Sequence, residues 1–265
     1  MHRVLRYCVV LLIGATLSNT AVAGDAGGNP TEEQITRLLY SQEELLATGG
    51  RHLVYKAWPK FAGRYIVASY SEPKSNSLVP LSGLEPLPVE VAIVQYKGAI
   101  PTVISRRTFG YKGFPFAEKL QIDTANYQIA DTVTAFGLRA HGRDAGSGFE
   151  YHYESLDLYT VRSNGIDHVA GNLTFGSGGL FESYNENSYC NNPNFCDLVW
   201  SEEIQKTILI VMPNKTNEYF DMLAKTTKTE KSGRLDESDK SAKPAVRTET
   251  TTHVFRWDGE KYQGE

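Results

Sequence analysis

The sequence predicts a mainly β fold, either an antiparallel β-sandwich or a meander, with one N-terminal helix. From Leu53 onward, short apolar or alternating segments are separated by Gly, Pro, Asn and Asp, which is typical of strands joined by turns. The chain also contains 15 Tyr and 11 Phe, whose rings suit the pleated faces of a sheet. We therefore expect one β-rich domain over residues 24–265, a length sufficient for a sizeable core.

The first 23 residues are typical of a secretory signal peptide. Arg3 and Arg6 give a basic start, residues 7–16 form an apolar run, and residues 21–23 (Ala-Val-Ala) match a small-residue cleavage pattern. The apolar run is well below the roughly 20 residues that span a bilayer. We expect an exported chain with no membrane span after cleavage.

The expected helix covers residues 31–48. Pro30 and Thr31 are typical of a helix start, and Gly49 with Gly50 ends the pattern. Between them apolar residues recur near helical spacing, at Ile35, Leu38, Leu39, Leu45 and Leu46.

Strands are expected wherever short apolar or alternating runs lie between turn residues. These runs are residues 65–70, 89–96, 101–108, 127–140, 149–161, 168–175, 198–199, 207–212, 219–227 and 250–257. Asn164-Gly165 and Asp258-Gly259 predict hairpin turns, because such pairs readily take positive φ angles.

Two connections between these strands lack an apolar pattern. Residues 72–88 are rich in Pro, Ser and Leu, and we expect an extended connection there. Residues 228–247 mix Lys, Glu, Ser and Asp with very few apolar residues, which predicts a disordered insertion between two strands.

Charge and cysteine content narrow the possible partners and the compartment. There are 27 basic residues against 31 acidic ones and no Lys/Arg stripe, which argues against nucleic acid and anionic lipid as partners. Cys8 would leave with the signal peptide, so Cys190 and Cys196 remain as one pair. In an oxidising compartment we expect them to form a disulfide that shapes a surface loop.

Three short motifs carry a resemblance to known proteins. They are residues 120–127 (LQIDTANY), 135–139 (AFGLR) and 255–262 (FRWDGEKY). In these motifs the chain resembles exported bacterial proteins of unassigned function. The resemblance implies a β-rich envelope protein, here expected in the periplasm or secreted, and it brings no catalytic residues.

The segment from Phe181 to Trp200 is the main candidate for binding, because aromatic residues alternate there with asparagines around the expected disulfide. Rings supply contact area at low entropic cost, while amides supply adaptable hydrogen bonds. The residues predicted to bind are Tyr184, Tyr189, Asn192, Phe195 and Trp200.

Two histidines are the main candidates for acid-base or metal chemistry. If residues 136–143 and 149–161 pair as a hairpin, His141 and His152 share one face and could titrate together or bind a metal. No zinc-type spacing and no Gly-x-Ser-x-Gly turn is present, and Gly176-Ser177-Gly178-Gly179 is interpreted as a loop. We therefore assign no catalytic residue, metal ligand or cofactor.

These observations favour a non-enzymatic binding or interaction protein whose partner is an envelope protein or a glycan. The favoured version is an inhibitor or immunity factor against an envelope-directed enzyme. One alternative is an envelope hydrolase of a glycan or ester, with His141 or His152 as base. Another is a carbohydrate-binding module that uses the same aromatic residues.

Overall fold

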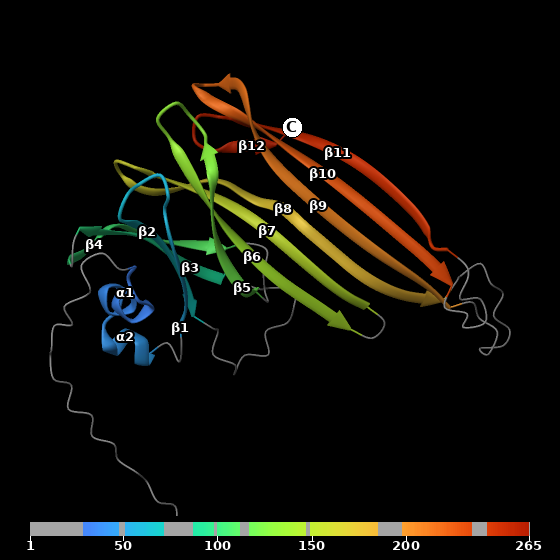
Figure 1. The fold of residues 1–265 in the computed structure, drawn as a ribbon, viewed down its shortest axis with the longest axis horizontal. Coiled ribbons are helices and arrows are strands. Elements are labelled where there is room, and N and C mark those ends of the chain that lie inside the picture. Colours follow the sequence, from blue (N-terminus) through green and yellow to red (C-terminus); the bar gives the residue numbers. More distant parts are fainter. Residues whose placement is uncertain are drawn as a thin grey trace, which may run out of the picture.

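The computed structural model describes residues 29–47, 51–71, 87–97, 100–111, 117–146, 149–184, 198–234 and 243–264. Within those ranges the chain forms short helices and long strands (Figure 1). The elements are α1 (Glu32–Leu39), α2 (Gln42–Ala47), β1 (Arg51–Ala57), β2 (Arg64–Ser71), β3 (Leu87–Lys97), β4 (Ile100–Tyr111), β5 (Ala117–Gln128), β6 (Thr134–Gly146), β7 (Phe149–Arg162), β8 (Gly165–Tyr184), β9 (Leu198–Thr216), β10 (Tyr219–Arg234), β11 (Ala245–Trp257) and β12 (Tyr262–Gly264).

The strands form two antiparallel meanders, so the predicted mainly β antiparallel fold is confirmed. One sheet has four strands in the order β1-β2-β3-β4, and the other has eight in the order β12 to β5. Neighbours in the chain are therefore neighbours in each sheet. In Figure 1 the helices and the four-stranded sheet lie at the left, while β9–β11 extend toward the lower right.

The two sheets pack face to face through a shared apolar core. Alternate residues of β2 and β3, such as Ile66 and Ile93, meet Leu138 of β6 and Tyr159 of β7 in this core. The intervening residues of β2 and β3 point to the opposite face, because side chains alternate along a strand. There Val67 of β2 and its neighbours in β3 are covered by α1, so the two central strands of this sheet are buried on both faces.

The eight-stranded sheet opens at one end. β8 pairs with β9 only from Gly176 to Tyr184, so the earlier part of β8 and the later part of β9 diverge. A second apolar core, which includes Leu158, Met222 and Trp257, occupies this region. A backbone hydrogen bond also joins the two sides of this region, because Phe220 N–H donates to the carbonyl of Ile129 at 2.8 Å.

The single predicted helix over 31–48 is wrong in one respect: the chain forms two helices separated at Tyr40 and Ser41. Tyr40 is extended (φ −132°, ψ 135°), and its buried hydroxyl bonds to Ser69 and Glu90. Ser41 then caps α2, because its hydroxyl accepts from Glu44 N–H while the Glu44 carboxylate accepts from Ser41 N–H. This Ser-x-x-Glu capping box was the overlooked signal.

Several strand boundaries differ from the prediction. Residues 127–140 are not one strand, because β5 ends at Gln128 and a loop over 129–133 precedes β6. Residues 168–175 belong to the longer β8, and residues 198–199 and 207–212 are parts of the continuous β9. Apolar runs mark only parts of these strands, so their polar stretches carried no signal.

The predicted disordered insertion over 228–247 is wrong at both ends. β10 continues to Arg234 and β11 begins at Ala245. The two strands pair in an unbroken register from Ser232 opposite Ala245 to Met222 opposite Phe255. Because this hairpin extends into solvent, it needs no apolar alternation. Threonines and opposite charges pair across it instead, as in Lys228 opposite Glu249.

Both predicted hairpin turns are present. Gly165 (φ 126°) closes the β7–β8 turn and Gly259 (φ 115°) closes the β11–β12 turn. In the second turn the Asp258 carboxylate accepts from the backbone N–H groups of Lys261 and Glu260, and these bonds lower the pKa of Asp258 to about 2.

Some predicted features lie outside the described residues: the signal peptide (1–23), most of the 72–88 connection, and the disulfide pair Cys190 and Cys196. Among the helices that the structure does describe, none has the length and apolar character needed to cross a bilayer.

Candidate functional site

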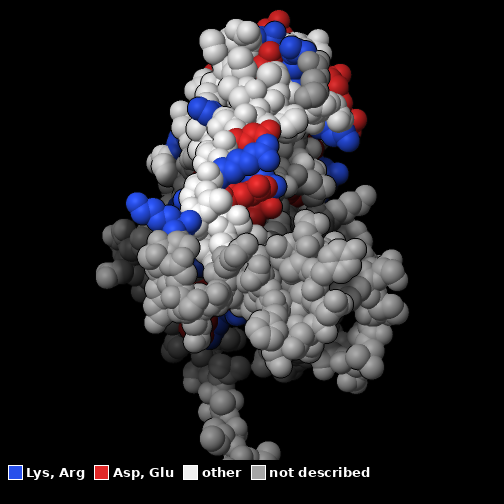
Figure 2. Space-filling model, turned by 90° about the vertical axis from the view of Figure 1, so that its right-hand side faces the viewer, with Lys and Arg blue, Asp and Glu red and all other residues white. Residues whose placement is uncertain are grey.

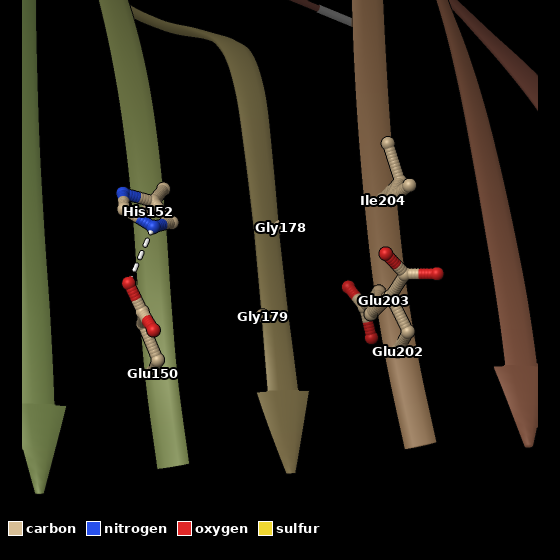
Figure 3. Close-up of a pocket in the computed structure, with 7 residues that line it drawn as sticks. All are labelled: Glu150, His152, Gly178, Gly179, Glu202, Glu203 and Ile204. Carbon is tan, nitrogen blue, oxygen red and sulfur yellow. Dashed lines mark hydrogen bonds and ion pairs between the residues drawn. The ribbon is translucent and has the colours of Figure 1, made fainter.

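A trough runs across the eight-stranded sheet where β7, β8 and β9 lie side by side (Figure 3). Its floor is Gly176 and Gly178 of β8. Glu154 and His152 of β7 lie directly opposite these glycines on one side, and β9 lies opposite them on the other. Because the floor has no side chains, the flanking strands form raised walls. We call this feature the glycine trough.

The glycines of the trough are strand residues, so the loop predicted for residues 176–179 is wrong. None of them has a positive φ among the described residues, so backbone freedom does not explain them. A Cβ added at Gly176 would lie 3.7 Å from its nearest neighbours, an ordinary contact. Glycine at this position therefore leaves open space above the sheet.

The trough has the size of a ligand site. Its volume is about 580 Å³, and a second hollow of about 310 Å³ continues from it toward Glu150, Glu202 and Glu203. Ligand sites commonly have volumes of about 300–1,000 Å³. Figure 3 shows the glycine strand between the polar residues of β7 and those of β9.

The apolar wall of the trough comes from β9. Alternate residues of a strand share a face, which places Ile204, Lys206, Ile208 and Ile210 on one side of β9. Ile208 is 56% exposed and Ile210 is 41% exposed. Large aliphatic side chains exposed in a row are typical of a contact surface.

The histidine prediction is confirmed in its geometry. β6 and β7 pair as expected, with His141 opposite Glu154 and Arg143 opposite His152, so both imidazoles lie on one face and line the trough. His152 Nε2 lies 3.0 Å from Glu150 Oε1, and His141 Nδ1 lies 3.8 Å from Glu154 Oε2. The Nε2 atom of His141 is buried and has no hydrogen-bond partner among the described residues.

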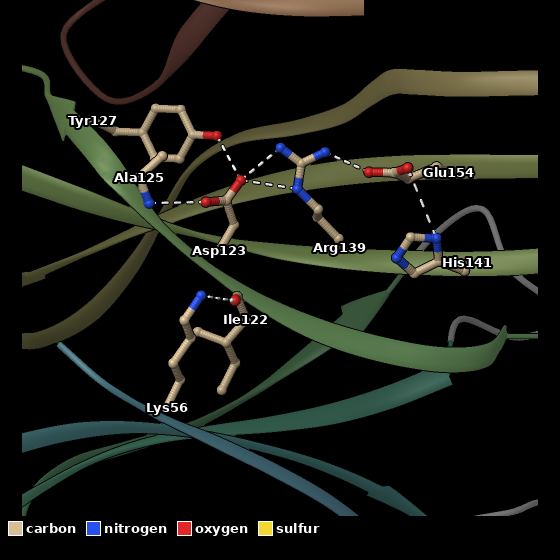
Figure 4. A network of polar contacts seen from close by, with 8 residues as sticks. All are labelled: Lys56, Ile122, Asp123, Ala125, Tyr127, Arg139, His141 and Glu154. Carbon is tan, nitrogen blue, oxygen red and sulfur yellow. Dashed lines mark hydrogen bonds and ion pairs between the residues drawn. The ribbon is translucent and has the colours of Figure 1, made fainter. Parts of the chain in front are cut away.

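A charged network fixes the wall beside His141 (Figure 4). The Arg139 guanidinium donates to Asp123 Oδ2 through Nε (2.8 Å) and Nη2 (2.6 Å), and to Glu154 through Nη1. Tyr127 donates its hydroxyl to the same Asp123 oxygen at 2.8 Å. Because Glu154 accepts from Arg139 and lies 3.8 Å from His141, the network links the trough to the β5–β6 pair.

The pKa directions in this network follow from burial and pairing. Burial by itself would raise the pKa of Asp123, but hydrogen bonds from Ala125 N–H, Arg139 and Tyr127 outweigh it, so the pKa lies below its ordinary value. Burial and the neighbouring Asp123 both raise the pKa of Tyr127. Asp123 and Arg139 are thus held in their charged forms and Tyr127 in its neutral form.

The Phe175 ring, which lines the trough, already contacts a side chain of the protein itself. The Arg139 guanidinium lies 3.9 Å from its centroid, a cation–π contact. One face of this ring is therefore covered, which reduces its value as a stacking platform for a sugar.

Charges of both signs flank the far side of the trough. Lys231 Nζ lies 2.8 Å from Glu202 on the face of the trough, and on the opposite face of the sheet Lys228 Nζ lies 3.0 Å from Glu203. On the side of the molecule seen in Figure 2, blue and red side chains likewise lie next to one another. This mixture of signs suits a ligand with mixed charges rather than a polyanion.

The structure places two of the five predicted binding residues at least in part. Trp200 lies on the same face of β9 as Glu202 and Ile204 and is half-buried against Gly233 of β10. Tyr184 is the last residue of β8, where its backbone pairs with Leu198. Tyr189, Asn192 and Phe195 lie outside the described residues.

The trough itself was missed because its signal is weak. A run of glycines next to an alternating Ile-x-Lys-x-Ile pattern in the following strand is compatible with a hollow in a sheet. The two segments are far apart in sequence, however, and only strand pairing brings them together. The predicted binding segment leaves from these same two strands.

In the ranges that the structure describes, no three His, Cys, Asp or Glu side chains are grouped so as to hold a metal ion. Comparison of this chain with protein-family models, with curated proteins and with solved structures gives no match. The function is therefore inferred from the site alone.

Proposed function

We propose that this is an exported, non-enzymatic binding protein that receives an extended segment of a partner protein in the glycine trough. The observation that carries the proposal is the floor without side chains at Gly176 and Gly178, between walls of opposite character. A partner there would contact aliphatic side chains on β9 and polar ones on β7.

The chemistry of the walls favours polypeptide over glycan. Sugar sites usually offer free aromatic faces, whereas here Phe175 is covered by Arg139 and Trp200 packs on Gly233. The exposed isoleucines of β9 match aliphatic side chains of a partner, and His141 Nε2 is a buried polar atom still without a partner among the described residues. Peptides present both kinds of group.

The hydrolase alternative has less support. The Glu150–His152 pair resembles a base with its orienting carboxylate, but the two side chains are 44% and 61% exposed. The two charges of an exposed ion pair are surrounded by water and therefore interact with each other only weakly. The carbohydrate-binding alternative is weakened by the occupied rings described above.

Export remains part of the proposal and has its own test. Cleavage after residue 23 predicts that the mature protein recovered from the envelope fraction begins near Gly24. N-terminal sequencing of that material checks this, and an intact Met1 would contradict it.

The test of the trough uses a photo-reactive amino acid in place of Ile208 in the exported protein. After illumination of cells we expect one protein adduct, identified by mass spectrometry. Gly176→Leu, which fills the floor where a Cβ fits, should abolish this adduct. Ser201→Leu is the matched control, since Ser201 is exposed on the opposite face of β9.

The outcomes separate the alternatives. A protein adduct lost in Gly176→Leu and retained in Ser201→Leu supports the proposal. A glycan adduct would establish the carbohydrate-binding alternative, and an adduct unaffected by Gly176→Leu would show that binding occurs elsewhere.

A further inference from the structure

The free edge of β11 is the second unusual feature of the eight-stranded sheet. β12 pairs only with Phe255, Arg256 and Trp257, so in the described part of the chain no strand covers residues 245–254 on that side. Residues 245–253 are all exposed, and Val246 is 60% exposed. Figure 1 shows β11 along the outer border of the sheet.

This edge has little of the usual protection against pairing. Edge strands are commonly blocked by proline, by charged side chains (lysine above all), by bulges or by a covering segment, and here only Arg247 and Glu249 are charged. Residues 245–254 (AVRTETTTHV) contain neither proline nor lysine, and their register with β10 continues without a bulge. The edge is thus long, regular and rich in threonine.

The direction of its backbone groups follows from the terminal hairpin. Asp258 N–H donates to Lys261 across the β11–β12 turn. N–H and C=O groups change side at every residue in an antiparallel ladder, so the even-numbered residues of β11 direct theirs away from β10. Val246, Thr248 and Thr250 therefore present donors and acceptors that no described residue pairs with.

We propose that β11 pairs with β11 of a second copy of this chain around a two-fold axis at Thr248. In this register Thr248 faces Thr248 of the partner subunit, and Val246 faces the partner's Thr250. The two strands then form about six hydrogen bonds. The sheet continues from one copy into the other.

Charge selects this register over its neighbours. With the axis at Thr248, Arg247 lies directly opposite the partner's Glu249, and the pair occurs twice. Moving the axis to Glu249 would place the two glutamates together, and moving it to Arg247 would place the two arginines together. Only the Thr248 register makes both contacts attractive.

The contact does not depend on the proposed ligand of the trough. A two-fold axis normal to the sheet keeps each face on its own side, so the two troughs would open on the same side of the joined sheet. The occupant proposed here is a second copy, because the edge is complementary to itself.

Charge reversal with heterodimer rescue tests the register. Sedimentation velocity over a concentration series should show reversible dimerisation of the mature wild-type protein. Arg247→Glu and Glu249→Arg should each weaken self-association about ten-fold, because each turns two attractive contacts into repulsive ones. An equimolar mixture of these two variants should dimerise as strongly as the wild type, since both opposite-charge contacts return.

Two further variants complete the experiment. Thr248→Pro removes an outward N–H without removing a bond to β10, and it should abolish dimerisation. Glu260→Arg makes the same charge change as Glu249→Arg in an exposed turn and should leave dimerisation unchanged. Circular dichroism confirms that each variant is folded. A monomeric wild type, or a mixture that associates no better than its components, would overturn the proposal.

Discussion

Two strands of this protein, β2 and β11, share an antiparallel geometry but differ in what stabilises them. β2 has buried residues on both faces from Tyr65 to Tyr70, whereas residues 245–253 of β11 are exposed throughout. β2 is stabilised by apolar area on two sides. β11 is stabilised by its backbone ladder with β10 and by cross-strand pairs of threonines and charges.

This difference in burial distinguishes the strands that build the core from the strands whose surfaces are free to bind a partner. The central strands β2 and β3 lie between α1 and the eight-stranded sheet, so both of their faces contribute to apolar cores. The outer parts of β8 to β11 have faces that no described element covers. The glycine trough and the free edge of β11 both lie there.

The largest expected effect contrasts one isoleucine from each region. Ile93→Ala removes a fully buried side chain between the sheets and should lower the free energy of unfolding by about 3–4 kcal/mol. Ile208→Ala in the trough should lower it by less than about 1 kcal/mol, because that side chain is 56% exposed. Urea unfolding of both variants measures this; equal losses would remove the distinction between the regions.

The next effect concerns the network that supports the trough. Arg139→Ala leaves Asp123 and Glu154 partly buried without their shared cation and should cost about 3 kcal/mol. Arg143→Ala is the control four residues further along β6, where an exposed pair with Glu150 should contribute less than about 1 kcal/mol. Comparable losses in the two variants would show that the network contributes no more stability than an exposed ion pair.

A smaller effect appears in the pH dependence of stability. The pKa of Asp123 is lowered in the folded protein, so its contribution is fully present above the ordinary value of 3.8 and is lost as pH falls below it toward the folded pKa. Asp123→Asn should therefore lower stability near neutrality and flatten this acid dependence. Urea unfolding at a series of pH values checks the slope; an unchanged slope would assign the acid sensitivity to other carboxylates.

The smallest effect belongs to the exposed ion pairs of β9 and β10. A double-mutant cycle on Lys231 and Glu202 should give a coupling energy of about 0.2–1 kcal/mol that declines in high salt. A coupling several times larger would mean that this part of the sheet is covered in solution.

How much was predictable varies along the chain. Apolar runs located β2, β3 and β7, and Asn-Gly and Asp-Gly located two hairpins, because these signals are local. The break at Tyr40 was not visible from periodicity, since the partners of its hydroxyl, Ser69 and Glu90, lie in strands far along the chain. The resemblance to exported bacterial proteins, and the location inferred with it, stay predictions.

The candidate site was only partly predictable for the same reason. Pairing of β6 with β7 placed His141 and His152 on one face as expected, because a short hairpin fixes its own register. The trough forms only because β8 pairs with β9, and a long segment separates these strands in sequence. Gly176 was therefore interpreted as a loop residue, whereas in the structure it is a strand residue that forms the floor of the trough.

By itself, the sequence determined the mainly β class, the antiparallel hairpins and the shared face of the two histidines, because these depend on residue preferences and neighbouring strands. Only the tertiary structure decided which strands are buried on both faces, where the sheet splits, and where it stays open to solvent. Those features depend on which distant surfaces pack together, and burial is a property of the packed chain rather than of any segment.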